Sequence, residues 1–461
     1  MHEGERWWIR IDGDYLGGTG RGLRTCRSAG WVVGVRLSET FAFMRGNVLV
    51  LSISGALGMF SRSMVFPWTP LYIISLGGHP AEIGIVYALG PLGGLFVFPV
   101  AGYLADHFNR ARLIAFAGFL SGGIILINVF ATSWEWIAVA RLLQGFIVFH
   151  FPATSAIVAD SLPPENRARG IATMNTVSGT AAIFAPYVAG LLIDSYGIDT
   201  GMRILYGAMS AAYVAGALIN LLFITETHRE ENVHISFLNT SEILKSAYSG
   251  IPSMLGRFSR PMKALAVIII LGFVANGVAS PFWVVYAKEN LGLSSTQWGL
   301  VLLIESSARN LAGIPAGFVV DRFGRTRFII GSLIVGAVLI AFFGIADGFL
   351  FVVLVRCGVS VASSFLSPAC GALVADLMPR DIRGRTMAAI GRGTNRLAPA
   401  GGGTGGPGVG FLVTIPLVIA SFCGGILFEW DPRSPWIFVP VILTISLLIA
   451  IFFVRDPQEA E

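Results

Sequence analysis

The sequence contains one charged motif twice, as GYLADHFNRAR at residues 102–112 and as GFVVDRFGRTR at residues 317–327. Corresponding residues are 215 positions apart, and the same spacing relates Arg141 to Arg356. Spacings of 214 to 216 also relate Gly58 to Gly272, Pro67 to Pro281, Tyr72 to Tyr286, Asp160 to Asp376, Pro163 to Pro379, and Arg167 to Arg383. A register held over this length predicts two structurally equivalent halves. Parallel repeats are typical of transporters that bind their cargo between the halves.

The composition excludes an ordinary water-soluble protein. Hydrophobic residues make up 54% of the 461 residues and charged residues only 13%, against about 25% charged in a typical soluble domain. We therefore expect a multi-pass membrane protein. The net charge of +5 is dispersed among short loops, which favours anionic lipid headgroups over nucleic acid as its partner.

Twelve apolar segments are candidates for membrane spans, since a span needs about 20 such residues. They are 47–74, 81–104, 112–132, 135–159, 171–193, 202–225, 263–288, 295–319, 327–346, 349–375, 408–429 and 435–454. Backbone groups in lipid must bond internally, so the spans are expected to be helices. The predicted fold class is an all-α membrane protein with 12 transmembrane helices in two pseudo-symmetric six-helix bundles.

The predicted domain organisation follows from these spans: a poorly ordered N-terminal extension at 1–46, an N-terminal bundle at 47–225, a cytoplasmic linker at 226–262, and a C-terminal bundle at 263–454. Met44 is a second candidate for the native start, because the repeat begins just after it. The second half carries a Gly-rich insertion, predicted as a loop at 398–407 after a cytoplasmic or interfacial helix at 384–397. No GK[ST] follows these glycines, which argues against a phosphate-binding loop.

Lysine and arginine placement predicts the orientation. The loops after the even-numbered spans, the linker and both termini carry nearly all of these residues, whereas the opposite loops hold only Arg203, Lys288 and Arg433. Basic loops face the cytoplasm. We therefore expect a multi-pass protein of the plasma membrane with both termini in the cytoplasm.

The duplicated motif resembles the signature loop of the major facilitator superfamily, G-x-L-A-D-x-x-G-R-[RK]. The second copy keeps the family's glycine at Gly324, whereas the first has Asn109, which tolerates left-handed backbone better than most residues. The segment from Arg141 to Gly145 resembles the family's R-x-x-Q-G element. The segment 185–190 is similar to the G-P-x-x-G-G element of its proton-coupled exporters, although alanines replace two glycines. The resemblance covers about residues 45–455 and implies a drug/proton-antiporter-like transporter.

The resemblance implies a gating role for the signature loops, whose residues here are Gly102, Asp106, Arg110, Gly317, Asp321, Gly324 and Arg325. Carboxylates at the cytoplasmic ends of spans can bind a helix N-terminus or an arginine, and so latch the two halves in one state. The alternative is that these charges only anchor the loops in lipid headgroups. Arg141 and Arg356 are expected to share a scaffold role.

Charged residues inside spans are candidates for the cargo and proton pathway. Arg62 lies deep in the first span, and its counterpart in the repeat is Asn276. In this superfamily the first and seventh spans line the central cavity, which the resemblance supplies. Arg62 is predicted to contact cargo or to assist proton coupling; the alternative is a structural salt bridge.

Glu305 and Arg309 are four residues apart, so they share one face of the eighth span. Either they form a buried, self-neutralising pair, or Glu305 exchanges protons while Arg309 changes partner. His150 lies inside the fourth span and is predicted either to relay protons or to be a hydrogen-bonded structural residue.

The predicted function is secondary active transport of a small organic solute by alternating access, with proton-coupled export preferred. Proton-coupled uptake and a non-transporting membrane sensor are the alternatives. The four cysteines form no CxxC pair, and no metal, cofactor, nucleotide or enzymatic motif is expected. The expected partners are a small-molecule solute, protons and membrane lipid, and the chain is expected to be a monomer.

Overall fold

The computed structural model describes residues 8–11, 14–17, 44–227, 255–378, 386, 389–390 and 410–456. The chain divides into two compact units, Met1–Ala42 and Phe43–Glu461. In the first unit, β1 (Trp8–Ile11) and β2 (Asp14–Gly17) form an antiparallel hairpin in which Ile9 lies opposite Leu16. Most of the predicted linker, most of the predicted helix at 384–397 and the whole Gly-rich insertion lie outside the described residues.

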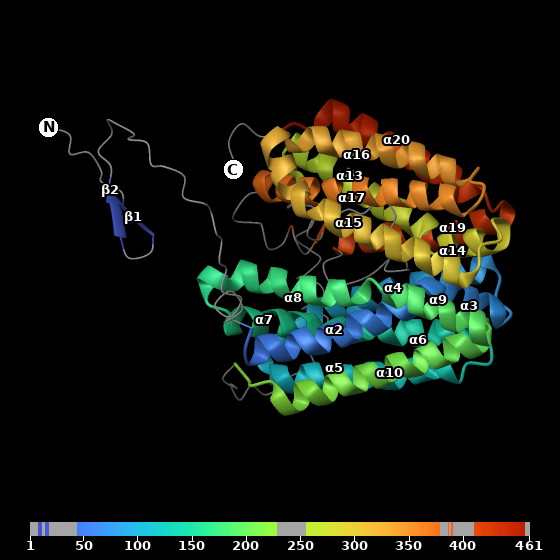
Figure 1. The fold of residues 1–461 in the computed structure, drawn as a ribbon, viewed down its shortest axis with the longest axis horizontal. Coiled ribbons are helices and arrows are strands. Elements are labelled where there is room, and N and C mark those ends of the chain that lie inside the picture. The colour runs from blue at the N-terminus through green and yellow to red at the C-terminus, as the bar shows by residue number, and fades with distance from the viewer. Residues whose placement is uncertain are drawn as a thin grey trace. The chain divides into compact units, whose positions relative to one another are not determined.

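The described secondary structure of Phe43–Glu461 is helical (Figure 1), as the sequence predicts for the membrane part. Its N-terminal half contains α2 (Asn47–Val65), η1 (Phe66–Trp68), α3 (Thr69–Ser75), α4 (Pro80–His107), α5 (Arg110–Val129), α6 (Trp134–Phe146), η2 (Ile147–Phe149), α7 (His150–Ser161), η3 (Pro164–Asn166), α8 (Arg167–Ala182), α9 (Ala185–Tyr196) and α10 (Ile198–Phe223).

The C-terminal half contains α13 (Arg260–Ala279), α14 (Phe282–Val285), the π-helical turn η5 (Tyr286–Asn290), α15 (Ser295–Phe323), α16 (Arg325–Phe343), α17 (Phe349–Leu377), α19 (Phe411–Trp430) and α20 (Ser434–Phe453). Among the described residues, 11 helices are long and apolar enough to cross a membrane. They correspond to all the predicted spans except 295–319. That segment forms α15, whose mean hydropathy is lowered by Glu305 and Arg309 near its middle.

Prolines interrupt the first helix of each half at equivalent places. Pro67 lacks an amide hydrogen, so α2 ends at Val65 and a 3₁₀ turn follows. The helix α13 likewise ends two residues before Pro281. Beyond each break, the repeat-related Tyr72 and Tyr286 donate hydrogen bonds of 2.9 Å to a carbonyl near the end of α5 or α16. Equivalent residues of the repeat therefore make equivalent contacts.

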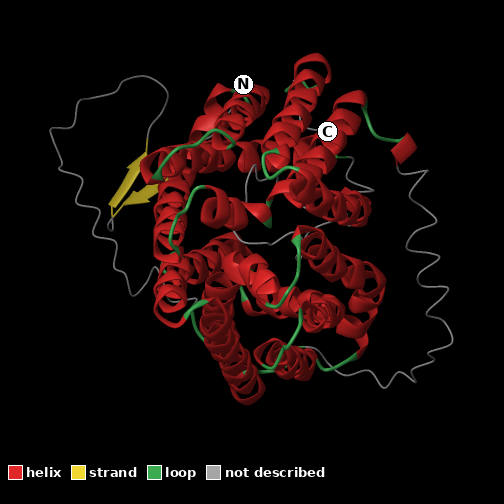
Figure 2. Cartoon of the chain, turned by 90° about the vertical axis from the view of Figure 1, so that its right-hand side faces the viewer, coloured by secondary structure: helices red, strands yellow, loops and turns green. Residues whose placement is uncertain are grey.

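Among the described helices, the two halves pack on each other chiefly through α4 with α19, α9 with α15, and α3 with α14. Glycines permit the close approach. A Cβ atom on Gly84 would lie 2.5 Å from the carbonyl oxygen of Ser421, and one on Gly190 would lie 2.5 Å from that of Ser295. Figure 2 is viewed from the side of Figure 1 on which α3, α9, α14 and α19 lie together.

Many large apolar side chains remain exposed on the outside of the helices. Phe130 is 75% exposed, Leu222 is 70% exposed and Ile345 is 70% exposed. Such exposure would be costly in water and is typical of helices that face lipid. The exposed surface therefore agrees with the composition.

Candidate functional site

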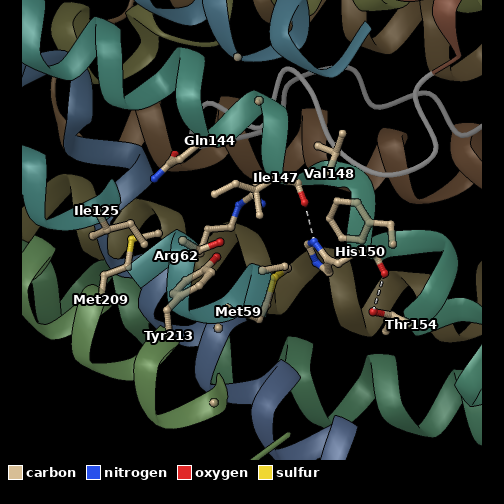
Figure 3. A pocket seen from close by; sticks show the side chains of 18 of the residues that line it. Met59, Arg62, Ile125, Gln144, Ile147, Val148, His150, Thr154, Met209 and Tyr213 are labelled. Atoms are coloured by element: carbon tan, nitrogen blue, oxygen red, sulfur yellow. Dashed lines mark hydrogen bonds between the residues drawn. The ribbon is translucent and has the colours of Figure 1, made fainter. Parts of the chain in front are cut away.

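A cavity of about 420 Å³ lies among the helices of the N-terminal half (Figure 3). Its walls come from α2, η1, α4, α5, α6, η2, α7 and α10, and Thr414 of α19 also lines it. Glycines leave much of the space: Gly55, Gly58, Gly90, Gly94, Gly118, Gly145 and Gly216 all lie in the walls. A cavity of this volume can hold a small organic molecule.

Arg62, predicted to contact cargo, lines this cavity. It lies in the last turn of α2, where the negative end of the helix dipole favours a cation. The central carbon of its guanidinium lies 4.4 Å from the centroid of the Phe66 ring, a cation–π contact. Figure 3 shows Arg62 and Tyr213 approaching the same part of the cavity from α2 and α10.

Arg141 lines the same cavity. Its guanidinium carbon lies 4.3 Å from the Phe66 ring centroid and 5.2 Å from the Tyr87 ring centroid. The Nη2 atom is buried and has no hydrogen-bond partner among the described residues. Arg141 therefore belongs to the cavity, in addition to the scaffold role that the sequence predicts for it.

The cavity is positively charged. Within the described part of the chain, its lining contains Arg62 and Arg141 but no aspartate or glutamate. No described carboxylate lies within 4 Å of either guanidinium. Both guanidinium carbons lie within 4.4 Å of the same Phe66 ring centroid, so the two like charges are close enough to repel each other. Among the described residues, the cavity thus holds two cations without a carboxylate as counter-ion.

His150 also lines the cavity, beside Gln144 and Val148. Its Nδ1 atom lies 2.7 Å from the carbonyl oxygen of Ile147, and its ring lies 4.2 Å from that of Phe151. The first contact follows from the 3₁₀ turn η2, which separates α6 from α7. His150 is therefore hydrogen-bonded and close to the space in which a solute would bind.

Asn276 is buried in α13 at 5% exposure and does not line this cavity. The repeat pairs it with Arg62 in sequence, but the structure does not bring the two residues into one site. Glu305 and Arg309 are also absent from the lining. The predicted pathway residues therefore divide into Arg62 and His150 at the cavity, and the other three in the C-terminal half.

Glu305 pairs with Arg356 rather than with Arg309. The carboxylate oxygen Oε2 accepts hydrogen bonds from Nε of Arg356 at 2.8 Å and from Nη2 at 2.7 Å. Both side chains are fully buried, and the guanidinium also lies 4.2 Å from the Trp283 ring centroid. The expectation of a self-neutralising Glu305–Arg309 pair is therefore wrong. Arg356 lies on α17, which packs along α15, and this tertiary contact cannot be read from the helical spacing.

The signature loops form ion pairs within their own halves. Arg110 donates to Asp160 at 3.0 Å, and Arg325 pairs with Asp376. Asp106 lies 3.8 Å from Arg110 and is 72% exposed at its side chain. The second loop repeats this arrangement, with Asp321 3.7 Å from Arg325 and 67% exposed. In the described residues, neither Asp106 nor Asp321 forms an ion pair with the opposite half in this structure.

The glycines of the signature loops differ in whether the backbone conformation or the surrounding space requires a glycine. Gly324 adopts φ +96°, which favours glycine. Asn109 does not use the left-handed backbone predicted for it: its φ is −57°, and its side chain caps α5 by accepting a 2.9 Å bond from the Arg112 amide. A Cβ on Gly102 or Gly317 would meet nothing within 4 Å, so neither glycine is sterically required in this conformation.

Several residues of the site were not singled out from the sequence. Tyr87, Tyr213 and Phe66 line the cavity, yet each lies in an apolar helical stretch with no signal of its own. Gln144 belongs to the R-x-x-Q-G element, which could have indicated it. Asp194 was also missed: it accepts bonds of 3.0 and 2.7 Å from the amides of Ser295 and Thr296 at the start of α15.

The sequence profile of the Major Facilitator Superfamily matches residues 51–261 and 265–461. The chain belongs to the major facilitator superfamily. It is a multi-pass membrane protein, and members of this superfamily carry small-molecule solutes. It is therefore a transporter and not an enzyme.

Relatives of the chain include multidrug resistance proteins MdtG. The protein of Escherichia coli (strain K12 / DH10B) is 26% identical over 308 residues, which cover 64% of this chain and 71% of that protein. The protein of Enterobacter lignolyticus (strain SCF1) is 25% identical over 287 residues, covering 60% of this chain and 65% of that protein. The matched part thus spans about two thirds of each relative.

Solved structures share the fold. The nucleoside transporter NupG superposes with a TM-score of 0.61 at 16% sequence identity, covering 89% of this chain and 98% of that chain. A bacterial homolog of the human lysosomal transporter Spinster, in an inward-facing and unoccupied conformation, gives a TM-score of 0.65 at 14% identity, with 89% and 98% coverage. At these identities, the likeness concerns the fold alone.

Proposed function

We propose that this chain is a secondary active transporter that exports a small organic solute across the plasma membrane by alternating access, in exchange for protons. The observation that carries the proposal is the cavity around Arg62 and Arg141. It lies inside the membrane helices, is large enough for a small molecule at about 420 Å³, and places two charged groups where lipid alone would not favour them.

Export is supported by two observations. The sampled relatives are named multidrug resistance proteins. The exporter-like element at 185–190 also lies at the contact between the halves, where Gly190 meets the backbone of Ser295. The segment therefore lies at a contact that would break and re-form as the two halves move during transport.

The proposed architecture has twelve spans in two six-helix bundles, at 47–225 and 263–454, joined by a cytoplasmic linker at 226–262. In it, α15 is the eighth span and completes the set of twelve. Its 29 residues are long enough, and Leu311, Ile314 and Phe318 form a stripe that is 70%, 73% and 79% exposed, as suits lipid contact. The basic loops orient both termini toward the cytoplasm. The extension at 1–46, the loop at 398–407 and a monomeric state complete the proposed organisation.

Alternating access is supported by the contacts between the halves. One end of the helices is held by α4 with α19 and by α9 with α15, including the bonds from Asp194 to the amides that begin α15. At the opposite end, the described signature-loop ion pairs stay within each half. We assign the closed end to the outside. In the opposite state, Asp106 and Asp321 would bind across the halves and close the cytoplasmic end.

Proton coupling is assigned to Glu305. A buried carboxylate that takes up a proton loses its charge and its attraction to a neighbouring arginine. The partner that would be released is Arg356, which the structure places against Glu305. A change that favours one of two states shifts the population between them. Arg309 and His150 remain candidates for the next step of the proton path.

The test is solute-dependent proton movement in proteoliposomes that contain a pH-sensitive dye. When a solute enters down its gradient, exchange for protons makes the lumen more alkaline, whereas symport makes it more acidic. Glu305→Gln is expected to abolish the proton movement, and Glu429→Gln, at an exposed position of α19, is the matched control. A lumen that acidifies supports uptake instead. Wild-type protein that moves nothing across a broad solute panel supports the sensor.

A further inference from the structure

The repeat relates Gly90 of α4 to Glu305 of α15. Both helices begin with the same cap, in which the side chain of the third helical residue accepts a hydrogen bond from the backbone amide of the residue before the helix. Glu82 accepts from His79 at 2.8 Å, and Gln297 accepts from Ser294 at 2.9 Å. Glu82 and Gln297 are 215 positions apart, and so are His79 and Ser294. Gly102 and Gly317, near the other ends of the helices, have the same separation. The alignment of the two helices is therefore fixed at both ends, and in it Gly90 is the residue equivalent to Glu305.

The arginines beside these two positions also correspond, since Arg141 and Arg356 are 215 positions apart. In the C-terminal half, Glu305 forms a buried ion pair with Arg356, and its Oε2 atom lies 2.8 Å from Nε and 2.7 Å from Nη2 of that arginine. In the N-terminal half, the equivalent of the carboxylate is a glycine, and Gly90 and Arg141 both line the cavity. The Nη2 atom of Arg141 is buried without a hydrogen-bond partner among the described residues.

We propose that the solute supplies the missing carboxylate: an organic anion binds in the cavity with its negative group beside Gly90, where it pairs with Arg141 and is attracted by Arg62. This inference names the substrate class of the site and rests on the proposed function. Guanidinium groups bind carboxylate, sulfonate and phosphonate groups through short charge-assisted hydrogen bonds. The repeat itself provides the example, in the pair of Glu305 with Arg356.

The rest of the cavity fits the apolar body of such an anion. Met59, Ile125 and Met209 line it, and Figure 3 shows them around Arg62. Apolar walls with a few placed polar groups are typical of small-molecule sites, and methionine adapts to ligands of varied shape. An inorganic anion would gain nothing from these walls, so the site is predicted to prefer an anion with an apolar body.

The test uses full-length protein in detergent and four probes of nearly one shape: 2-naphthoate, 2-naphthalenesulfonate, neutral 2-naphthamide and cationic 2-(aminomethyl)naphthalene. Inorganic sulfate is the fifth probe. Binding is read as the shift of the thermal unfolding midpoint, followed by tryptophan fluorescence, over a range of probe concentrations. The two naphthyl anions are expected to bind at least tenfold more tightly than the other three probes. Arg141→Gln is expected to weaken naphthoate binding at least tenfold.

Gly90→Glu introduces into the cavity a carboxylate at the position equivalent to Glu305. A Cβ at Gly90 would meet only the Arg141 carbonyl oxygen, at 3.8 Å, which is an ordinary contact. Gly90→Gln is the control of the same size. Naphthoate binding is expected to be lost in Gly90→Glu and retained within a few-fold in Gly90→Gln. If neither Gly90 variant folds, Arg141→Gln decides the matter.

The inference is overturned if no anion binds to the wild type, if the amine or inorganic sulfate binds as tightly as naphthoate, or if Arg141→Gln or Gly90→Glu binds naphthoate unchanged. Its failure is distinguishable from that of the proposed function. Coupled transport of cations without anion binding sinks only this inference. Naphthoate binding with the predicted variant pattern, but no transport of any solute, sinks only the proposed function.

Discussion

At the scale of single residues, the surroundings decide what an arginine does. Arg356 is enclosed, paired with Glu305 and stacked near Trp283, so it stabilises the packing of α15 on α17. Arg141 has the same place in the repeat but lies at a cavity. The sequence indicates the duplication of the two arginines. It does not reveal their difference in role, because that difference depends on residue 90 of another helix.

Removal of one member of the buried ion pair is predicted to destabilise the protein strongly. Glu305→Ala leaves Arg356 buried without its carboxylate, and such losses cost about 3–5 kcal/mol. The midpoint of thermal unfolding in detergent should fall accordingly. Replacement of both partners by apolar residues, as Glu305→Leu with Arg356→Met, should recover most of the loss. An unfolding midpoint of Glu305→Ala equal to that of the wild type would contradict the structural role of the pair.

At the scale of the elements, glycine and one carboxylate hold α9 against α15. Gly190 leaves room for the backbone of Ser295, and Asp194 satisfies two of the amides that begin α15, which every helix N-terminus leaves without an intrahelical partner. A helix N-terminus also attracts a negative charge. The contact is therefore strong enough to close one end, yet consists of few groups that must separate when it opens.

Gly190→Ala is predicted to favour opening at this contact, because its Cβ would lie 2.5 Å from the carbonyl oxygen of Ser295. The measurement is the rate at which a membrane-impermeant maleimide modifies Thr296→Cys in a protein without other cysteines. The rate should rise several-fold. Gly179→Ala is the control in the preceding helix α8, where a Cβ meets nothing within 4 Å. Equal rates in both glycine variants would contradict the steric argument.

Asp194→Asn is predicted to weaken the same contact without any steric change. The variant loses the charge that caps α15 and the 3.9 Å ion pair with Lys288, and the loss of a capping carboxylate costs about 0.5–2 kcal/mol. The accessibility of the residue-296 thiol should therefore rise by roughly two- to thirtyfold, by the usual relation of free energy to population. Asp199→Asn, which removes an ion pair within one half, should leave the thiol as protected as before.

The elements were largely predictable from the sequence, whereas the site was predictable in part. Long apolar runs and prolines locate the helices, and the repeat predicts a span at the segment of α15 although its charges lower its hydropathy. Arg62 and His150 could be singled out because charged or titratable residues in spans are rare, whereas a cavity beside Arg62 was implied only by the family resemblance. The pairing of Glu305 with Arg356 and the position of Gly90 and Arg141 at one cavity could not be predicted, because both depend on contacts between helices that are distant in sequence.

At the scale of the whole transporter unit, Phe43–Glu461, two halves with equivalent caps, prolines and tyrosine contacts close on each other at one end. The cavity lies in the N-terminal half, and Thr414 of the C-terminal half also lines it. Movement between the halves would therefore change access to Arg62 and Arg141. We predict that the two ends of the helices open and close in opposition.

The most direct test of this claim is a pair of distance measurements between spin labels on repeat-related, exposed positions. Labels at Thr132 and Asp347 report on one end, and labels at Arg112 and Arg327 report on the other. Distances would be recorded in nanodiscs, in acidic and alkaline buffer, with and without 2-naphthoate. Alternating access predicts two populations at each end, with one distance lengthening as the other shortens. A single unchanging distance at both ends, or changes in the same direction, would contradict it.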